Sequence, residues 1–407
     1  MSHGRNMMHR IAIVAITVAA TLMLAGIAAA APVHASGCAT PTGPNRVRCT
    51  ALIFHRVLLR SVTAPQGYGP AQLRVAYGLG ALAGTNPTTT QTVAIVDAYN
   101  DPNLASDLAA YRSYFGLSAC PTASGCLRVV SQAGSTRLPV GSTAWGLETS
   151  LDAEMVSAIC PRCHIAVVEA SSATYADLGA AENEAVKLGA HVISNSWGGT
   201  DSPRDSSYDS QYFNHPGVAI VAATGDSGFA AGPIYPSTSP DVIAVGGTTL
   251  TPAAGTPRGY AEAAWSGGGS GCSSVESMPA WQAALPNAVA ACGTHRAVAD
   301  VSADANPATG VAVYDTYGYA GWYPGMIGGT SLAAPIVGAI YALAGNAAGA
   351  ASAGAGDLYA HASYTLPNLF DVVSGSNGTC TARLACTAGA GWDGPTGLGS
   401  PDGIAGF

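Results

Sequence analysis

The stretch that decides the fold is Thr92–Asp97, which reads TVAIVD. A short apolar run of this kind is typical of a strand that is buried on both faces, as in a parallel sheet covered by helices. The last residue of the run is a carboxylate, and in such sheets the active site lies beyond the carboxyl ends of the strands. The stretch therefore predicts an α/β fold with functional groups near Asp97.

Strands and helices alternate along the rest of the chain. Further strands are expected at His164–Val168, His191–Asn195, Pro216–Ala223 and Val242–Val245, and helices at Asn103–Phe115, Trp145–Ile159, Tyr175–Leu188 and Ser331–Ala347. This alternation predicts a single α/β domain with a mostly parallel sheet and helices on both faces. Asn195 and Asp226 also lie at or just after expected strand ends, so we expect them near Asp97.

Charged residues are scarce in this sequence. They make up 10% of the 407 residues, against roughly 25% in an average soluble protein, and the net charge is −8. Lys187 is the only lysine and no basic stripe is present, so nucleic-acid binding is not expected. Few carboxylates mean little gain of positive charge on acidification, which suits an acidic exterior. A codon bias towards Ala and Gly explains the composition equally well.

The N-terminus has the three parts of a secretory signal. Arg5 and Arg10 form a basic start, Ile11–Ala31 is apolar, and Val33–Ala35 fits a small-x-Ala cleavage site. We expect the signal to end near Ala35 and the protein to be secreted and extracellular. An uncleaved anchor is the alternative, because the apolar run is long enough to span a bilayer.

The domain organisation follows from this boundary. We expect residues 1–35 to be the signal, 36–65 a short N-terminal extension or propeptide, and 66–407 the main domain. No later segment is long and apolar enough to cross a membrane, so stable membrane association is not expected. We expect a monomer.

Ten cysteines in an exported protein indicate disulfides. They fall in close sequence pairs, and nearest-neighbour bridging is the expected connectivity, although sequence alone does not prove it. The pairs are Cys38/Cys49, Cys120/Cys126, Cys160/Cys163, Cys272/Cys292 and Cys380/Cys386. Cys160 and Cys163 have the spacing of a redox motif, but without a thioredoxin-like context a structural clasp is the better interpretation.

The most specific motif is GGTSLAAP, which begins at Gly328 and contains Ser331. The glycines permit a tight turn, and the serine then opens a helix, where backbone N–H groups and the helix dipole favour developing negative charge. An ordinary helix cap is the alternative to a nucleophile. The motif resembles the nucleophile segment of the subtilisin-like superfamily. Those enzymes also need a histidine-containing segment as base, and none of the nine histidines lies in one.

Carboxylates offer another base. Glu148 and Asp152 are four residues apart on an expected helix and so lie on one face. Two close carboxylates share a proton and have split apparent pKa values, which allows them to exchange a proton with a serine in acid. A solvated helix face is the alternative, but the apolar neighbours, among them Trp145 and Met155, favour a buried pair.

The segment AATGDSG, which contains Asp226, is the third element. Subtilisins have an amide side chain here as an oxyanion donor. A carboxyl group donates a hydrogen bond only when it is protonated. An aspartate at this position therefore indicates that the protein acts at acidic pH. A turn or helix-cap aspartate is the alternative.

Together these motifs resemble those of the sedolisins, the serine-carboxyl peptidases. The resemblance extends from about Tyr68 to the C-terminus and includes Ser194–Gly198, Trp265–Gly269, Pro279–Gln282 and Asp300–Ala303. It implies a subtilisin-like fold and a secreted, acid-acting endopeptidase that cleaves proteins or peptides through an acyl-enzyme.

The resemblance also implies roles for single residues. Ser331 would be the nucleophile, Glu148 the base and acid, Asp152 its orienting partner and Asp226 the oxyanion donor.

Around these four, the resemblance implies supporting residues. Ser196, Trp197 and Gly198 would line the substrate cleft as an extended edge that pairs with peptide backbone. Asp97 would support the site without being catalytic.

Two Gly-rich stretches near the C-terminus contain hard oxygen ligands of the kind that Ca²⁺ prefers. By resemblance to the sedolisin calcium site, Asp371 and Asp393 would bind one structural Ca²⁺ through their side chains, and Val372, Gly389 and Gly391 through backbone carbonyls. A pair of turn aspartates is the alternative.

Sedolisins carry a long folded propeptide, whereas only residues 36–65 separate the expected signal from the catalytic region here. Two other functions remain open. The chain could be a tripeptide-releasing exopeptidase, or a catalytically silent binding module on the same scaffold. A silent module has no need to keep Glu148, Asp152 and Asp226 together.

Overall fold

The computed structural model describes residues 1, 33–36, 38, 45–55, 64–80, 91–345, 354–362 and 368–407. The signal segment expected over residues 1–35 lies almost entirely outside them. The described residues from Val33 to Phe407 belong to one unit.

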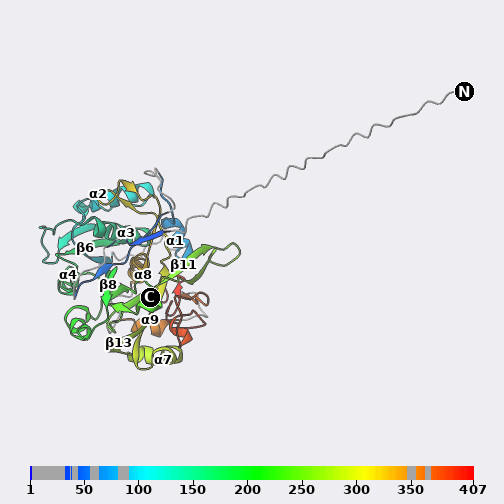
Figure 1. Ribbon diagram of the computed structural model, residues 1–407. Coiled ribbons are helices and arrows are strands. Elements are labelled where there is room, and N and C mark those ends of the chain that lie inside the picture. Colours follow the sequence, from blue (N-terminus) through cyan, green and yellow to red (C-terminus); the bar gives the residue numbers. More distant parts are fainter. Residues whose placement is uncertain are drawn as a thin grey trace. The chain divides into compact units, whose positions relative to one another are not determined.

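The centre of the described chain is an eight-stranded sheet with the order β12-β11-β9-β7-β4-β6-β5, in which β15 also pairs with β11. Two of these strands, β6 and β11, are labelled in Figure 1. Its strands are β4 (Thr92–Ala98), β5 (Leu127–Ser131), β6 (His164–Ala170), β7 (Val192–Asn195), β9 (Ala219–Ala223), β11 (Ile243–Pro252), β12 (Tyr260–Ala264) and β15 (Val301–Asp304). All pairs are parallel except β11–β12. The predicted mostly parallel sheet is confirmed.

Helices cover both faces of this sheet. The longer ones are α2 (Leu104–Tyr114), α3 (Thr143–Ile159), α4 (Tyr175–Lys187) and α8 (Thr330–Ala344); shorter ones are α1 (Pro70–Ala76), α7 (Pro286–Cys292) and α9 (Gly356–His361). Val93 and Ile95 of β4 join the apolar cluster that contains α3 and α8, whereas Ala94 and Val96 join the cluster that contains α4. Alternate side chains thus face opposite helical layers, which explains the continuous apolar run.

The predicted elements differ from the observed ones mainly at their ends. The strand expected from Pro216 begins at Ala219, because Gly217 adopts a positive φ of 90° in a turn. The helix expected to reach Ala347 ends at Ala344, where Gly345 in the left-handed conformation forms its C-cap.

Helix α3 is buried along almost its whole length. All residues from Trp145 to Ile159 are buried, and the helix packs against α8, α1, α2 and β4. Glu148, Asp152 and Glu154 are therefore held in an apolar environment, which is costly for ionised carboxylates. Such an arrangement favours protonated or shared-proton forms of these groups.

Residues 45–55 cross the molecule between two small sheets. Strand β2 (Arg48–Cys49) pairs antiparallel with β8 (Trp197–Thr200), whose other neighbour is β10 (Ile234–Tyr235). Strand β3 (Leu52–His55) lies between β1 (Val33–Ser36) and β18 (Met326–Gly328). Part of the expected N-terminal extension is thus integrated into the fold of the main domain.

All ten cysteines form the five nearest-neighbour disulfides that the sequence predicted. The Cys160–Cys163 bridge follows the end of α3 and is buried, which agrees with a structural clasp.

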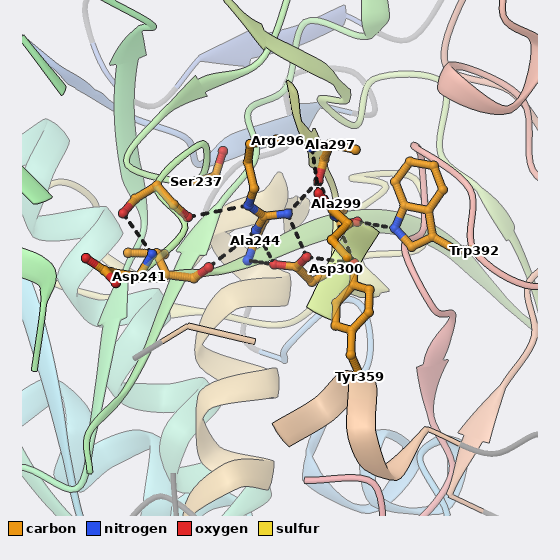
Figure 2. A network of polar contacts seen from close by, with 12 residues as sticks. Ser237, Asp241, Ala244, Arg296, Ala297, Ala299, Asp300, Tyr359 and Trp392 are labelled. Atoms are coloured by element: carbon orange, nitrogen blue, oxygen red, sulfur yellow. Dashed lines mark hydrogen bonds and ion pairs between the residues drawn. The ribbon is translucent and has the colours of Figure 1, made fainter. Parts of the chain in front are cut away.

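A buried ion pair lies at the far end of the sheet from β5 (Figure 2). Arg296, in β14 (His295–Val298), donates to both oxygens of Asp300 at 2.8 and 2.5 Å, and both side chains are fully buried. Asp300 also accepts hydrogen bonds from the Ala244 N–H and the Tyr359 hydroxyl. The network ties β11, β14 and α9 together.

Candidate active site

The Ser331 hydroxyl lies in the first turn of α8 and is buried. Its Oγ is 2.7 Å from Thr50 Oγ1 and donates to the Ser196 carbonyl at 3.2 Å. Gly329, the N-cap, has a positive φ of 99°, which lets the chain turn sharply into the helix. The helix N-terminus thus presents a serine hydroxyl where negative charge is favoured.

Glu148 and Asp152 lie one helical turn apart on α3, and both have zero exposure. Glu148 Oε2 accepts the Ala51 N–H at 2.9 Å, and Asp152 Oδ1 accepts the Ser196 hydroxyl at 2.8 Å. Their other oxygens have no hydrogen-bond partner among the described residues. One oxygen of each carboxyl is therefore free to carry a proton.

The pKa of Glu148 is raised well above its usual value by burial and then by the charge of Asp97. The Ser331 hydroxyl and the Ala51 N–H act in the opposite direction on this pKa. Burial, Asp97 and Glu148 likewise raise the pKa of Asp152, while the Ser196 hydroxyl lowers it. The three carboxyls therefore cannot all ionise and must share protons.

Asp97 is fully buried at the carboxyl end of β4. Burial raises its pKa to about 7, and the nearby Thr149 of α3 opposes this shift. Because its charge raises the pKa values of both Glu148 and Asp152, Asp97 acts on the pair electrostatically.

Asp226 follows β9 and contacts Thr330, the residue before Ser331. Its Oδ1 accepts both the N–H and the hydroxyl of Thr330, at 2.7 and 2.9 Å, and its Oδ2 is closed to solvent without a hydrogen-bond partner among the described residues. Burial raises the pKa of Asp226 to about 7, and the charge of Arg48 works against this. In acid this carboxyl is a neutral hydrogen-bond donor beside the serine.

The structure brings Ser196, Trp197 and Gly198 to the same place, but in different ways. Ser196 contacts both Asp152 and Ser331, and the backbones of Trp197 and Gly198 pair with Cys49 and Arg48. The Trp197 ring is not in the cleft: its indole N–H donates to the Val96 carbonyl and the side chain is fully buried.

Sequence reasoning missed four residues that the structure places at this site: Arg48, Thr50, Ala51 and Thr330. Three of them belong to the segment interpreted as an extension. The run RCTALIF, from Arg48, is extended in character and could have indicated strands here. Nothing local indicates that these strands pass the serine.

The expected calcium residues also lie together. Asp371 accepts the Gly391 N–H, and Asp393 accepts the Gly389 N–H, at 3.0 and 2.9 Å. Burial raises the pKa of Asp393 to about 7, and the charge of Asp371 adds to this. Asp371 Oδ1 is buried without a hydrogen-bond partner among the described residues. Two close carboxyls with a free oxygen fit a hard cation.

Comparisons with known proteins identify relatives of this chain. Residues 138–363, more than half of the chain, match the subtilase family. Kumamolisin from Bacillus sp. (strain MN-32) is 32% identical over 375 residues, which cover 84% of this chain and 63% of kumamolisin. Sedolisin from Pseudomonas sp. (strain 101) is 39% identical over 181 residues, covering 41% of this chain and 28% of sedolisin.

Among solved structures, Pseudomonas sedolisin, a serine-carboxyl proteinase complexed with two molecules of pseudo-iodotyrostatin, matches with a TM-score of 0.67 and 27% identity. The match covers 83% of this chain and 96% of that one. Fold and site thus define a subtilisin-like α/β protein with a serine in the first turn of a helix and buried carboxyls close by.

The chain belongs to the subtilase family and is similar to kumamolisin and sedolisin. It spans less than two thirds of the length of the curated relatives that it matches. Among the helices of the described residues, none combines the length and the apolar character that a membrane span requires.

Proposed function

We propose that this protein is a secreted, acid-acting serine-carboxyl endopeptidase. The observation that supports the proposal is that Ser331 contacts Thr50, that the next residue, Ala51, donates to Glu148, and that Thr330, next to the serine, donates to Asp226. Burial raises the pKa values of both carboxyls. Ser331 would be the nucleophile, Glu148 its general base, and Asp226 the donor to the oxyanion.

In the first half of the reaction, Glu148 takes the proton of Ser331 as Oγ attacks the peptide carbonyl carbon. The protonated Asp226 donates to the developing oxyanion through the oxygen that Thr330 leaves free. Glu148 then passes the proton to the leaving amine, and an acyl-enzyme remains.

In the second half, water attacks the acyl-enzyme, Glu148 accepts a water proton, and Ser331 regains its proton as the acid product leaves. Asp152, held by the Ser196 hydroxyl, and Asp97 determine how many protons the cluster holds. They thereby keep Glu148 able to cycle between its two forms.

The length of the paired strand in the site favours an endopeptidase over a tripeptide-releasing enzyme. Backbone pairing along the cleft extends beyond β2, because Val47 N–H donates to the Ala173 carbonyl at 3.1 Å and Arg46 forms a bridge with Thr174. A strand in this cleft thus continues for at least five residues before Ala51. An enzyme that releases tripeptides needs a barrier three residues before the bond that it cuts. Here the chain itself occupies the space where that barrier would lie.

One Ca²⁺ would be held by Asp371 and Asp393 and by the carbonyls of Val372, Gly389 and Gly391. Within the described residues, these three carbonyls accept no hydrogen bond, whereas the neighbouring Ala390 and Trp392 carbonyls accept the Asn287 amide. The ion would supply charge neutralisation and loop rigidity, with no part in the chemistry.

Export through residues 1–35 would place the protein outside the cell, where disulfides persist. Residues 36–65 would then be an N-terminal extension ahead of the catalytic domain at 66–407.

The test is hydrolysis of a denatured protein between about pH 2 and 8 by the wild type and by Ser331→Ala and Glu148→Gln. We expect activity in acid for the wild type and none for either variant. Thr122→Ser, in an exposed turn away from the site, is the control and should leave activity unchanged. Activity that peaks near neutrality would rule out the protonated-carboxyl mechanism, and a fully processed, folded but inactive wild type would favour the silent binding module.

A further inference from the structure

Two buried carboxyls lie side by side at the carboxyl ends of β4 and β6. Asp97 and Glu169 are paired residues in the parallel register of these strands, and both have zero exposure. Adjoining strands are about 4.8 Å apart, so two ionised carboxyls at paired positions would repel strongly where water is excluded. At least one of the two must therefore keep a proton.

Both side chains point toward α3, the helix that carries the catalytic carboxyls. Side chains alternate along a strand, and Ile95 and Val167, two residues earlier in β4 and β6, belong to the apolar cluster of α3. Thr149 of α3 acts on the pKa of Asp97, which agrees with this orientation. Glu169 is thus a further buried carboxyl behind the catalytic pair, and the proposed reaction gives it no role.

The Glu169 carboxyl has one anchored oxygen and one free oxygen. Its Oε1 accepts the Asp101 N–H at 3.4 Å, whereas Oε2 is buried without a hydrogen-bond partner among the described residues. The same is true of both oxygens of Asp97. Buried polar atoms are almost always hydrogen-bonded. A proton on Glu169 Oε2 that is donated to Asp97, directly or through one buried water, would satisfy both groups.

The order in which the two groups ionise leaves this proton on Glu169. Burial raises the pKa of Glu169 to about 8; the Asp101 N–H opposes this shift, and the charges of Asp101 and Asp97 add to it. The pKa of Asp97 is raised less, to about 7. Both charged groups that act on Glu169 are thus carboxyls, and Ser131, its paired residue on β5, carries no charge. As the pH rises, Asp97 becomes a carboxylate while Glu169 is still a donor.

We propose that Glu169 is a positioning residue of the candidate active site: its proton stabilises the Asp97 carboxylate, and Asp97 in turn sets the protonation of Glu148 and Asp152. The inference rests on the proposed peptidase function and identifies a residue that restricts that function to acid. A hydrogen bond to the charged form of a group favours that form, so Glu169 lowers the pH at which Asp97 ionises. The charge of Asp97 raises the pKa of Glu148, which then keeps its proton and no longer serves as a base.

Two substitutions of Glu169 distinguish a hydrogen-bond donor from a residue that only fills space. Glu169→Met nearly keeps the volume but removes the donor, so Asp97 should ionise about 1 to 2 pH units higher, the value of one hydrogen bond to a charged group. Glu169→Gln keeps a donor, because its oxygen can accept the Asp101 N–H while its amide N–H faces Asp97. This variant should leave the ionisation of Asp97 near that of the reference.

The first measurement is a carboxyl carbon-13 NMR titration of the full chain between about pH 4 and 9, with labelled aspartate and in the Ser331→Ala background. Asp97→Asn identifies the Asp97 signal by its loss. Glu182→Met is the matched control, because Glu182 has zero exposure and a pKa raised to about 8, but belongs to α4 on the other face of the sheet. It should leave the Asp97 titration unchanged.

A reciprocal titration does not require the methionine variant to fold. With labelled glutamate, the Glu169 signal should titrate above the Asp97 signal, and Glu169→Gln identifies it by its loss. In Asp97→Asn the Glu169 midpoint should fall, because the charge of Asp97 no longer raises its pKa. An unchanged Glu169 midpoint would contradict the pairing. Circular dichroism verifies the fold of each variant.

The second measurement is the pH profile of kcat/KM in the Asp226→Asn background, where loss of the protonated oxyanion donor no longer limits activity at high pH. There Glu169→Met should extend activity upward by about 1 to 2 pH units. Glu169→Gln, the conservative variant, should restore the profile of the background. A residue that only supports the fold would lower activity without moving the midpoint.

The two measurements separate this inference from the proposed function. An Asp97 midpoint that is the same in Glu169→Met and Glu169→Gln overturns the inference, as does a shifted midpoint with an unchanged activity profile. If the wild type hydrolyses no protein at any pH, the proposed function fails, whereas the titrations still decide whether Glu169 acts on Asp97. A shift in Glu169→Met alone, matched in the activity profile, supports the inference.

Discussion

Asp226 accepts two hydrogen bonds from Thr330 through a single oxygen, one from the backbone N–H and one from the hydroxyl. The Thr330 hydroxyl in turn accepts the Gly225 N–H at 3.0 Å. This chain of contacts fixes the carboxyl plane and leaves Oδ2 as the position for a proton. The donor role of Asp226 therefore depends on pH in a way that an amide would not.

We expect Asp226→Asn to change the pH dependence of activity. The pKa of Asp226 is raised to about 7, so the wild-type donor is present below that pH and is lost above it. An amide donates at every pH, and the oxygen of the introduced amide could still accept from Thr330. The variant should retain a larger share of its acid-side kcat/KM above pH 7 than the wild type does.

Asp226→Ala is the comparison for this experiment, because it has no donor. Loss of one oxyanion donor lowers kcat by about 10² to 10³-fold, so we expect that loss throughout the acid range. If both variants and the wild type lose activity at the same midpoint pH, a group other than Asp226 controls the loss of activity at alkaline pH.

The folded protein should be more stable in acid than at neutral pH. Burial raises the pKa of Asp97 to about 7 from an ordinary value near 3.8. An acid with a raised folded-state pKa binds more protons when folded, so its contribution is full below the unfolded pKa and is lost as the pH rises through about 7. Glu148, Asp152 and Asp226 shift in the same direction.

Thermal unfolding of the Ser331→Ala variant between pH 4 and 8, at constant calcium, measures this effect without self-digestion. We expect Tm to fall across that range by at least about 5 °C. Asp97→Asn removes one titrating group and should flatten the dependence. A Tm that rises steadily from pH 4 to 8 would contradict the pKa directions.

Calcium should stabilise the C-terminal loops through Asp371. The test variant is Asp371→Asn, which removes the charge of the ligand but keeps one oxygen to accept the Gly391 N–H. Without calcium, the variant and the wild type should melt at nearly the same temperature. With calcium at about 100 times its Kd, only the wild type should gain about 2.7 kcal/mol.

The measurement is Tm with a chelator and with graded Ca²⁺, and Mg²⁺ serves as the control cation. Trp392, in the same loop, donates its indole N–H to the Ala299 carbonyl beside the buried ion pair (Figure 2). Loss of calcium should therefore destabilise the core as well as the loop. Equal gains for both proteins would exclude Asp371 as a ligand.

Breaking the Arg296–Asp300 pair should be severely destabilising. Asp300→Asn leaves a buried guanidinium without its counter-charge, which costs about 3–5 kcal/mol of the free energy of unfolding. The exposed pair Lys187–Glu184 is the matched control, and Lys187→Ala should change that free energy by less than about 1 kcal/mol. Urea denaturation at fixed pH measures both, and similar losses would contradict the role given to burial.

Much of the fold could be predicted because its signals are local. The apolar runs that form β4, β6, β7, β9 and β11 indicate buried strands, and α8 begins within one residue of the expected position. The ends of strands and helices were harder to predict, because the turn at Gly217 before β9 and the C-cap at Gly345 after α8 are single-residue backbone conformations. The close sequence spacing of the cysteines likewise predicted the disulfides.

The candidate site was predictable only in part. The spacing of Glu148 and Asp152 determines that they share a helical face, and the residues around Ser331 determine that it opens a helix. By contrast, 281 positions separate Thr50 from Ser331, and 97 separate Ala51 from Glu148. No local pattern encodes such contacts, so the sequence predicts only a short N-terminal extension or propeptide over residues 36–65.

The sequence by itself therefore determined the layers of the fold, the disulfide pairs and the types of side chain available for chemistry, since these depend on periodicity and short-range spacing. Only the tertiary structure decided that the N-terminal strand lies across the serine, that Trp197 turns into the core, and that burial shifts the carboxyl pKa values. These depend on which surfaces exclude water, and that is a property of the packed chain.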